Sequence, residues 1–174
     1  QKVLQKTKSI ENKIESLEKL SSQLEDLIAL TELCIEENDE SSSDEISEGL
    51  ESFKAKLESE KLATLLTGEY DNLNAIVTFH AGAGGTEAQD WAEMLYRMYN
   101  RWSERHDFKI NLLDYLDGDE AGMKSASLLV EGPNAYGYLK SESGVHRLVR
   151  VSPFDSSGRR HTSFAAIEVI PEID

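Results

Sequence analysis

The chain has 174 residues, and its 33 acidic and 18 basic side chains give it a formal net charge of −15 at pH 7. Hydrophobic residues make up 39% of it, without an apolar run long enough for a membrane span, so the composition predicts a soluble, folded protein. The single cysteine, Cys34, excludes an internal disulfide framework, and with no apparent signal peptide it favours a reducing, cytoplasmic location.

The negative charge argues against nucleic-acid binding in general, because it repels a phosphate backbone. Residues 1–70 hold 17 acids and 8 bases, a net of −9, and residues 71–174 hold 16 acids and 10 bases, a net of −6. Residues 140–162 are the exception, since 5 bases and 2 acids give them a net charge of +3. This local reversal of charge predicts a site that meets RNA.

The first 68 residues predict a helical domain. Apolar residues recur at steps of three and four from Val3 to about Ile35, which indicates a long amphipathic helix. Its main stripe comprises Ile10, Ile14, Leu17, Leu24, Ile28 and Ile35, widened by Leu20, Leu27 and Leu30. After a polar loop at 38–45, a second helix is marked by Ile46, Leu50, Phe53, Leu57 and Leu62. We expect the two helices to pack as an antiparallel hairpin or small bundle with a structural or docking role.

Residues 69–174 predict an α+β domain, a mostly antiparallel sheet with one main helix packed on it. The expected strands are residues 74–81, 108–116, 125–131, 145–151 and 161–170. The main helix is expected from Thr86 to about Arg105, with a capping box at its start. Its apolar face is expected to carry Trp91, Met94, Leu95, Met98 and Trp102. A further helical turn is expected within residues 133–140.

A glycine-rich loop, residues 82–85, joins the first strand to the main helix. Unpaired backbone N–H groups and the positive dipole end make such a junction suited to anions. The loop lacks the Gly-Lys-Ser/Thr of a P-loop, and Glu87 stands where the dinucleotide fingerprint needs glycine, so nucleotide binding is disfavoured. Two interpretations stay open for this loop alone, a permissive glycine turn or a functional tip.

A second loop, residues 152–158, lies between two expected strands and is rich in turn formers. Its proline is expected to present Ser152 and Phe154 at the tip, with His161 available to stack on a base. Phosphate contacts are expected from the nearby arginines, which are Arg147, Arg150, Arg159 and Arg160. The alternatives are a solvated basic face and a loop anchored by its phenylalanine.

We expect no catalytic site, metal site or cofactor in these residues. The four histidines show no metal-ligand spacing with cysteine or carboxylates, and Cys34 lies far away in an acidic helix. Serine, histidine and aspartate all occur in the basic loop, but no Gly-x-Ser-x-Gly nucleophile elbow is present.

Three segments resemble the bacterial peptide chain release factor 2 family: HAGAGGTEAQDW at 80–91, AYGYLKSESGVHRLVRVSPFDSSGRRHTSF at 135–164, and the following EVIPEID. The resemblance implies translation termination, with the ribosomal decoding centre and the mRNA stop codon as partners. The tripeptide Ser152, Pro153 and Phe154 implies the codons UGA and UAA. Gly84 and Glu87 match the readers of the first base, His161 the side chain that stacks on the second, and Thr162 the one that bonds the third.

The family also carries a Gly-Gly-Gln motif in a further C-terminal domain, and residues 1–174 lack it. The resemblance therefore implies a fragment that comprises the helical domain, residues 1–68, and a truncated codon-recognition domain, residues 69–174. Such a fragment is not expected to promote peptidyl-tRNA hydrolysis. Its helical domain is expected to contact a ribosomal protein. The alternatives are a non-catalytic regulator that occupies the decoding site and a structural coiled-coil adaptor.

Overall fold

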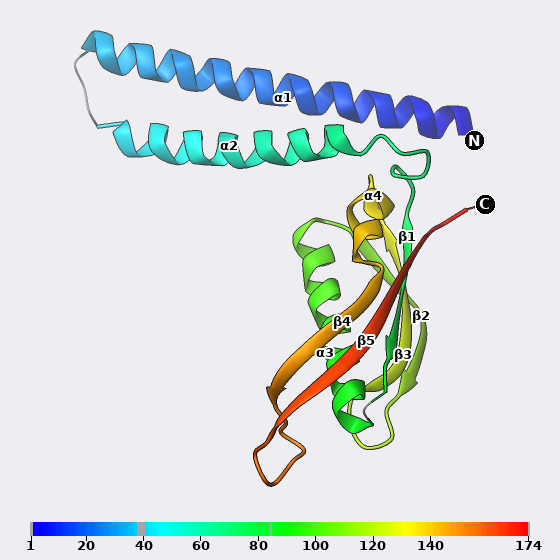
Figure 1. The fold of residues 1–174 in the computed structure, drawn as a ribbon. Coiled ribbons are helices and arrows are strands. Elements are labelled where there is room, and N and C mark those ends of the chain that lie inside the picture. The colour runs from blue at the N-terminus through cyan, green and yellow to red at the C-terminus, as the bar shows by residue number, and fades with distance from the viewer. Residues whose placement is uncertain (1, 38–40, 84, 174) are drawn as a thin grey trace. The chain divides into compact units, whose positions relative to one another are not determined.

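The computed structural model describes residues 2–37, 41–83 and 85–173 and divides the chain into two compact units, Gln1–Leu65 and Leu66–Asp174. The division lies close to the expected domains of residues 1–68 and 69–174. The helices are α1 (Lys2–Glu37), α2 (Ser43–Leu65), α3 (Thr86–Arg105), α4 (Ala135–Leu139) and the 3-10 helix η1 (Lys140–Glu142). The strands are β1 (Ala75–Ala81), β2 (Lys109–Asp117), β3 (Met123–Glu131), β4 (Gly144–Val151) and β5 (Arg160–Pro171). Figure 1 shows these elements in chain order.

Helices α1 and α2 form the predicted antiparallel hairpin (Figure 1). Ser16 donates a hydrogen bond to Glu60 at 2.5 Å, and Lys56 donates one to Gln23 at 3.0 Å. The partner of Ser16 is Glu60, and the partner of Gln23, further along α1, is the earlier residue Lys56 of α2. The two helices therefore run in opposite directions. No helix in the described ranges combines the length and the apolar character needed to cross a membrane.

The longer apolar stripe of α1 is exposed, although its length suggests that it would be the face packed against α2. The six residues of the main stripe are between 41% and 73% exposed; they are Ile10, Ile14, Leu17, Leu24, Ile28 and Ile35. Leu20, Leu27 and Leu30, the residues that widen the stripe, are half-buried instead. Leu27 lies against Gly49 of α2, where the missing side chain gives its methyl groups room. The shorter of the two stripes therefore lies on the protected face of the hairpin.

The second unit is a five-stranded sheet in the order β2-β3-β1-β5-β4, in which every pairing is antiparallel (Figure 1). All five predicted strands are present, within two residues of their expected ends. Alternate residues of β1, Ala75, Val77 and Phe79, are buried, because successive side chains of a strand point to opposite faces. The residues between them lie on the open face of the sheet.

Helix α3 covers the buried face of the sheet, as predicted, and three residues of its expected apolar face, Trp91, Leu95 and Trp102, pack on the core. The buried residues of its apolar face are Ala88, Ala92, Leu95 and Tyr99. Met98, which the sequence places on this face, is 49% exposed, so that expectation is wrong. Ala88 and Ala92 are fully buried on the contact face, whereas Met98 lies on the exposed side of the helix.

The expected capping box at the start of α3 is also wrong. The cap position is Gly85, at a φ of 59°, and no side chain caps it. Thr86 Oγ1 instead donates a hydrogen bond to Glu120, and Gln89 Nε2 donates one to Asp119. Thr86 and Gln89 therefore connect the helix to the β2–β3 loop, because that loop offers them carboxylate acceptors.

A candidate RNA interface at the start of helix α3

The start of α3 and the end of β4 are joined by an ion-pair network. Arg150 of β4 donates from Nε to Glu87 Oε1 at 2.6 Å and from Nη2 to Asp90 Oδ2 at 2.5 Å. Its Nη1 lies 3.3 Å from the Met94 sulfur. Glu87 and Asp90 are three residues apart and therefore share one side of the helix, so a single guanidinium reaches both.

Ser152 extends this network into the loop that follows β4. Its side chain is buried, with only 5% exposure, and its hydroxyl donates to Glu87 Oε2 at 2.6 Å. The Ser152 hydroxyl oxygen also accepts a hydrogen bond from the Phe154 backbone N–H at 3.1 Å. The sequence places Ser152 at the exposed tip of the loop, whereas in the structure Pro153 and Phe154 are exposed and the serine points inward.

Glu87 stays ionised although it is buried. Burial alone would raise its pKa, but hydrogen bonds from Arg150 and Ser152 and the nearby positive charge outweigh burial, so the pKa lies below its ordinary value. The hydrogen bond to Glu87 in turn raises the pKa of Arg150. The network is thus a fixed carboxylate held between a guanidinium and a hydroxyl.

Asp155 organises the rest of the loop. It accepts hydrogen bonds from the Ser157 N–H at 2.9 Å and the Ser157 hydroxyl at 2.5 Å, and it pairs with Arg159 at 3.0 Å. His161 Nε2 lies 2.8 Å from its Oδ2 atom. These contacts, led by those from Ser157 and His161, hold the pKa of Asp155 far below its usual range. The histidine ring is therefore oriented by the loop that it faces.

The structure brings four predicted site residues to one side of the sheet. Arg150 and His161 are direct partners across β4 and β5, on the face that α3 covers, and His161 is near enough to contribute to the lowered pKa of Glu87. Ser152 is bonded to the same glutamate. Glu87, Ser152 and His161 therefore meet in one place, although they come from three separate segments.

The remaining predicted residues divide into two groups. Thr162 and Arg147 lie on the open face of the sheet and are exposed, as is Arg160 at the start of β5. Arg159 and Arg150 are engaged by carboxylates, so their guanidinium groups already have partners. Pro153 and Phe154 are exposed in the loop, and Gly84 lies outside the described residues.

The donors and acceptors of this site suit recognition by hydrogen bonding. It offers a hydroxyl, a carboxylate, an imidazole and an exposed aromatic ring, which are groups that recognise base edges and base faces. In the described part of the chain, no cluster of three His, Cys, Asp or Glu side chains has the geometry to hold a metal ion.

The model of the PCRF domain family matches residues 1–167 of the chain. The chain belongs to this family. Its sequence is also similar to named family members over nearly its whole length. It is 53% identical over 161 residues to peptide chain release factor 2 of a Nitratiruptor species, which covers 92% of this chain and 44% of the relative. It is 51% identical over 174 residues to the same factor of Staphylococcus saprophyticus, which covers 100% and 47%.

A solved structure in the family shares the fold. RF2 of Thermus thermophilus matches with a TM-score of 0.65 and 48% identity, over 94% of this chain and 45% of that one. The chain thus spans a little under half the length of the PCRF relatives that it matches.

Sequence reasoning missed two side chains that organise the PCRF site. Asp90 is the second acceptor of Arg150, and Asp155 holds the loop and His161. Both carry a local signal. Asp90 lies one turn after Glu87 on the helix, and Asp155 precedes Ser157 by two residues, the spacing at which an aspartate accepts from a backbone N–H to close a turn.

Proposed function

We propose that the natural protein that carries this sequence terminates translation, and that the sheet unit reads UGA and UAA in the ribosomal decoding site. One observation supports this above the others. Glu87 and Ser152, which the family resemblance assigns to the first and second bases, are hydrogen-bonded to each other across 65 residues of sequence. Residues that inspect adjacent bases need this proximity.

The first base is read at the beginning of α3. The helix presents backbone N–H groups that have no partner within the helix, and these suit the carbonyl oxygens of uracil. Cytosine presents an amino group to the same donors, and the unmade hydrogen bond costs about 1–3 kcal/mol. Glu87, ionised and held by Arg150, keeps the loop and the helix start at a fixed separation.

The second base is read by the Ser152 hydroxyl. A hydroxyl has one proton to donate and two lone pairs to accept with, and here it donates to Glu87 and accepts from the Phe154 N–H. The second lone pair can accept from the amino group of adenine. Turning the proton away from Glu87 lets the same oxygen donate to O6 of guanine, so either purine is accepted.

The third base is separated from the second by β5. His161 and Thr162 are neighbours in this strand, and their side chains therefore point to opposite faces of the sheet. Stacking of the second base on the imidazole contributes about 1–3 kcal/mol. The third base then meets Thr162, which is exposed on the other face.

The phosphates are assigned to the exposed arginines first. Arg147 and Arg160 lie on the open face, and no ion pair holds either of them in the described ranges. Arg159 shares its charge with Asp155, which it bonds through Nε, and Arg150 serves chiefly to position Glu87. Arg147 and Arg160 therefore contribute most to RNA affinity, and Arg150 contributes to codon choice.

We further propose that residues 1–174 act at the ribosome in the cytoplasm without hydrolysing peptidyl-tRNA, and that the α1–α2 hairpin contacts a ribosomal protein. No Gly-Gly-Gln tripeptide occurs in these residues. Residues 1–174 added to ribosomes stalled at UGA are expected to compete with the full-length protein and to release no peptide. Peptide release above background by residues 1–174 would contradict this proposal.

The decisive experiment measures peptide release by the full-length protein on ribosomes programmed with UGA, UAA, UAG or a sense codon. Release is expected at UGA and UAA only. The double variant Ser152→Ala, Phe154→Ala is expected to lose most release at both codons. The matched control is Ser127→Ala, Phe164→Ala, which changes the same residue types on the open sheet face, outside the loop.

If the Ser152→Ala, Phe154→Ala variant kept the codon choice and the rate of peptide release of the wild type, the assignment of the tripeptide would be wrong. Ribosome binding at stop codons without any release by the full-length protein would instead favour the non-catalytic regulator. Release by the full-length protein at UAG as fast as at UGA and UAA would contradict the proposed codon specificity.

A further inference from the structure

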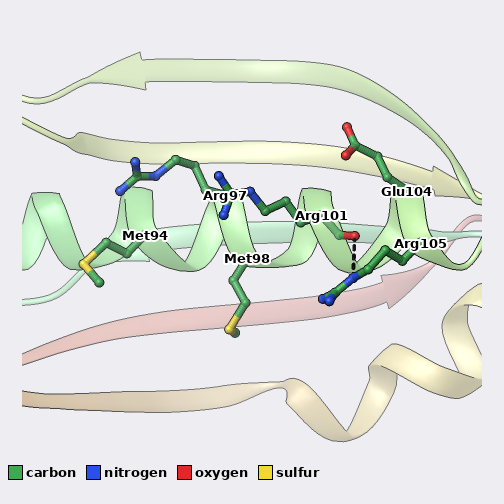
Figure 2. Close-up of a pocket in the computed structure, with 6 residues that line it drawn as sticks. All are labelled: Met94, Arg97, Met98, Arg101, Glu104 and Arg105. Atoms are coloured by element: carbon green, nitrogen blue, oxygen red, sulfur yellow. Dashed lines mark hydrogen bonds between the residues drawn. The ribbon is translucent and has the colours of Figure 1, made fainter.

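The outer face of α3 carries a row of arginines that the codon-reading site does not use. Arg97, Arg101 and Arg105 recur at every fourth residue, and all three are exposed. Four residues of helix rise about 6 Å, so the three side chains emanate from a row about 12 Å long. Figure 2 shows these residues along successive turns of the helix, together with Met94 and Met98.

These arginines differ from most other cations of the sheet unit in having no acidic partner. Five of the unit's ten lysines and arginines are in ion pairs with carboxylates: Lys109, Lys124, Lys140, Arg150 and Arg159. No ion pair in the described ranges involves Arg97, Arg101 or Arg105. Within the row, Arg105 Nε donates to the backbone oxygen of Arg101 at 3.3 Å. Positive charge is thus concentrated here without an ion pair, in a protein whose net charge is −15.

The row borders a shallow hollow of about 560 Å³. Its lining comprises the three arginines, Glu104, and two methionines, of which Met98 is 49% exposed. Guanidinium groups bind phosphate oxygens through paired N–H donors, and flexible thioether side chains adapt to sugar and base surfaces. An apolar strip beside a row of arginines therefore complements a nucleotide chain better than it complements a simple anion.

The hollow begins next to the codon-reading network and leads away from it. Met94 lies 3.3 Å from an Arg150 nitrogen, and Arg105 is 18 residues after Glu87, about 27 Å along the helix axis. A strand that follows this row meets no residue assigned to the codon. Its contacts are to the backbone, which position a complex without reading its sequence.

We propose that the outer face of α3, comprising Met94, Arg97, Met98, Arg101 and Arg105, is a second RNA-binding surface that follows the phosphodiester backbone of ribosomal RNA. The inference rests on the proposed function for the identity of its RNA. The surface adds affinity and leaves codon choice to Glu87, Ser152 and His161.

The test is binding of the full-length protein to stop-codon ribosomes over a range of salt concentrations. Each phosphate contact contributes about 0.7–0.9 to the slope of log affinity against log salt. The triple variant R97Q/R101Q/R105Q is expected to lower the slope by about 2–3. Between 50 and 200 mM salt, the wild type should then lose about 30-fold more affinity than the variant.

Two controls separate charge and position from general damage. Glu104→Gln removes an acid from the same hollow, so it should strengthen binding where the arginine variant weakens it. The variant R97K/R101K/R105K keeps the charge and should keep most of the slope. Equal affinity and slope for the triple glutamine variant and the wild type, with both folded, would overturn the inference.

A photoreactive side chain in place of Met98 identifies what occupies the hollow. Crosslinks to ribosomal RNA support the proposal, and crosslinks to ribosomal protein alone overturn it. Codon discrimination separates this inference from the proposed function. The arginine variant should retain the preference for UGA and UAA over UAG, whereas the Ser152→Ala, Phe154→Ala variant should lose it and keep the salt slope. Full-length protein that fails to bind ribosomes at all would overturn both proposals.

Discussion

The helical hairpin and the sheet unit differ in how completely they bury their apolar side chains. In the described part of the hairpin no side chain is fully buried, and its longest apolar stripe is exposed. The sheet unit buries Phe79, Leu95, Met123 and Leu128 almost completely between the sheet and α3. Polar groups stay in fixed positions when a packed core holds the elements that carry them. This explains why the hydrogen-bonded candidate site lies on the sheet unit.

The largest effect is expected from removing a core side chain. Phe79 is fully buried and packs against Tyr96 and Tyr99, so Phe79→Ala should lower the free energy of unfolding by about 3–5 kcal/mol. Leu27→Ala, in the half-buried seam of the hairpin, should cost about 1–2 kcal/mol. Urea unfolding followed by tryptophan fluorescence reports on the sheet unit, since both tryptophans lie in α3. Circular dichroism reports on the helices of the hairpin as well. An equal loss of unfolding free energy for Phe79→Ala and Leu27→Ala would contradict the difference in burial between the two units.

A glycine in each unit sharpens the same comparison. Gly122 has a φ of +70°, and an added Cβ would lie 2.2 Å from the backbone of Gln89, so Gly122→Ala should cost about 2 kcal/mol or more. At Gly49 the Cβ would meet only the flexible end of Leu27, and alanine is favoured over glycine in a helix by about 1 kcal/mol. Gly49→Ala should therefore be near neutral or stabilising. Thermal unfolding measures both variants, and a large loss for Gly49→Ala would show that the hairpin seam is as rigid as the sheet.

The Glu87 network should make stability depend on pH in the acid range. Because the pKa of folded Glu87 is lowered from 4.5, its contribution is fully present above that value and is lost as the pH falls through the lowered one. Glu87→Gln should cost about 1–3 kcal/mol at pH 7, with a smaller difference from the wild type below pH 4.5. Glu168→Gln, on the exposed face of β5, is the control. A difference that stays constant from pH 7 to pH 3 would contradict the assigned cause.

The smallest effect is expected from an exposed ion pair of the hairpin. Lys61 and Glu58 approach to 2.7 Å, but their side chains are 60% and 69% exposed. Water and salt screen such a pair, so Lys61→Ala should change the free energy of unfolding by less than about 0.5 kcal/mol. Chemical unfolding at low and high salt provides the measurement. A cost comparable to that of Glu87→Gln would mean that exposure does not separate the two kinds of pair.

The elements of secondary structure were predictable because their signals are local. The alternation within residues 161–170 and the apolar period of residues 86–105 depend only on neighbouring side chains, and both elements form as expected. The face of a helix that packs depends on its partner. Ala88 and Ala92 face the strands whereas Met98 is exposed, and Leu27 lies against Gly49 whereas the main stripe of α1 is exposed.

The candidate site was predictable as a set of residues and not as an arrangement. The loops at 82–85 and 152–158 were recognisable from their glycines, turn formers and nearby arginines. The inward turn of Ser152 was not, because it depends on a carboxylate 65 residues earlier in the chain. The pairing of Arg150 with Glu87 and Asp90 has the same origin, since no local pattern announces a partner so distant in sequence.

The irregular course of strand β2 bears on how the protein behaves when it is concentrated. β2 is an edge of the sheet and exposes Leu112, Leu113 and Leu116, a combination that invites strand-to-strand aggregation. Its pairing with β3 shifts register between Leu112 and Asp114 and again between Leu116 and Asp117. A straight strand from another molecule would fall out of phase at each bulge, so the edge is a poor template for growth of a continuous intermolecular sheet.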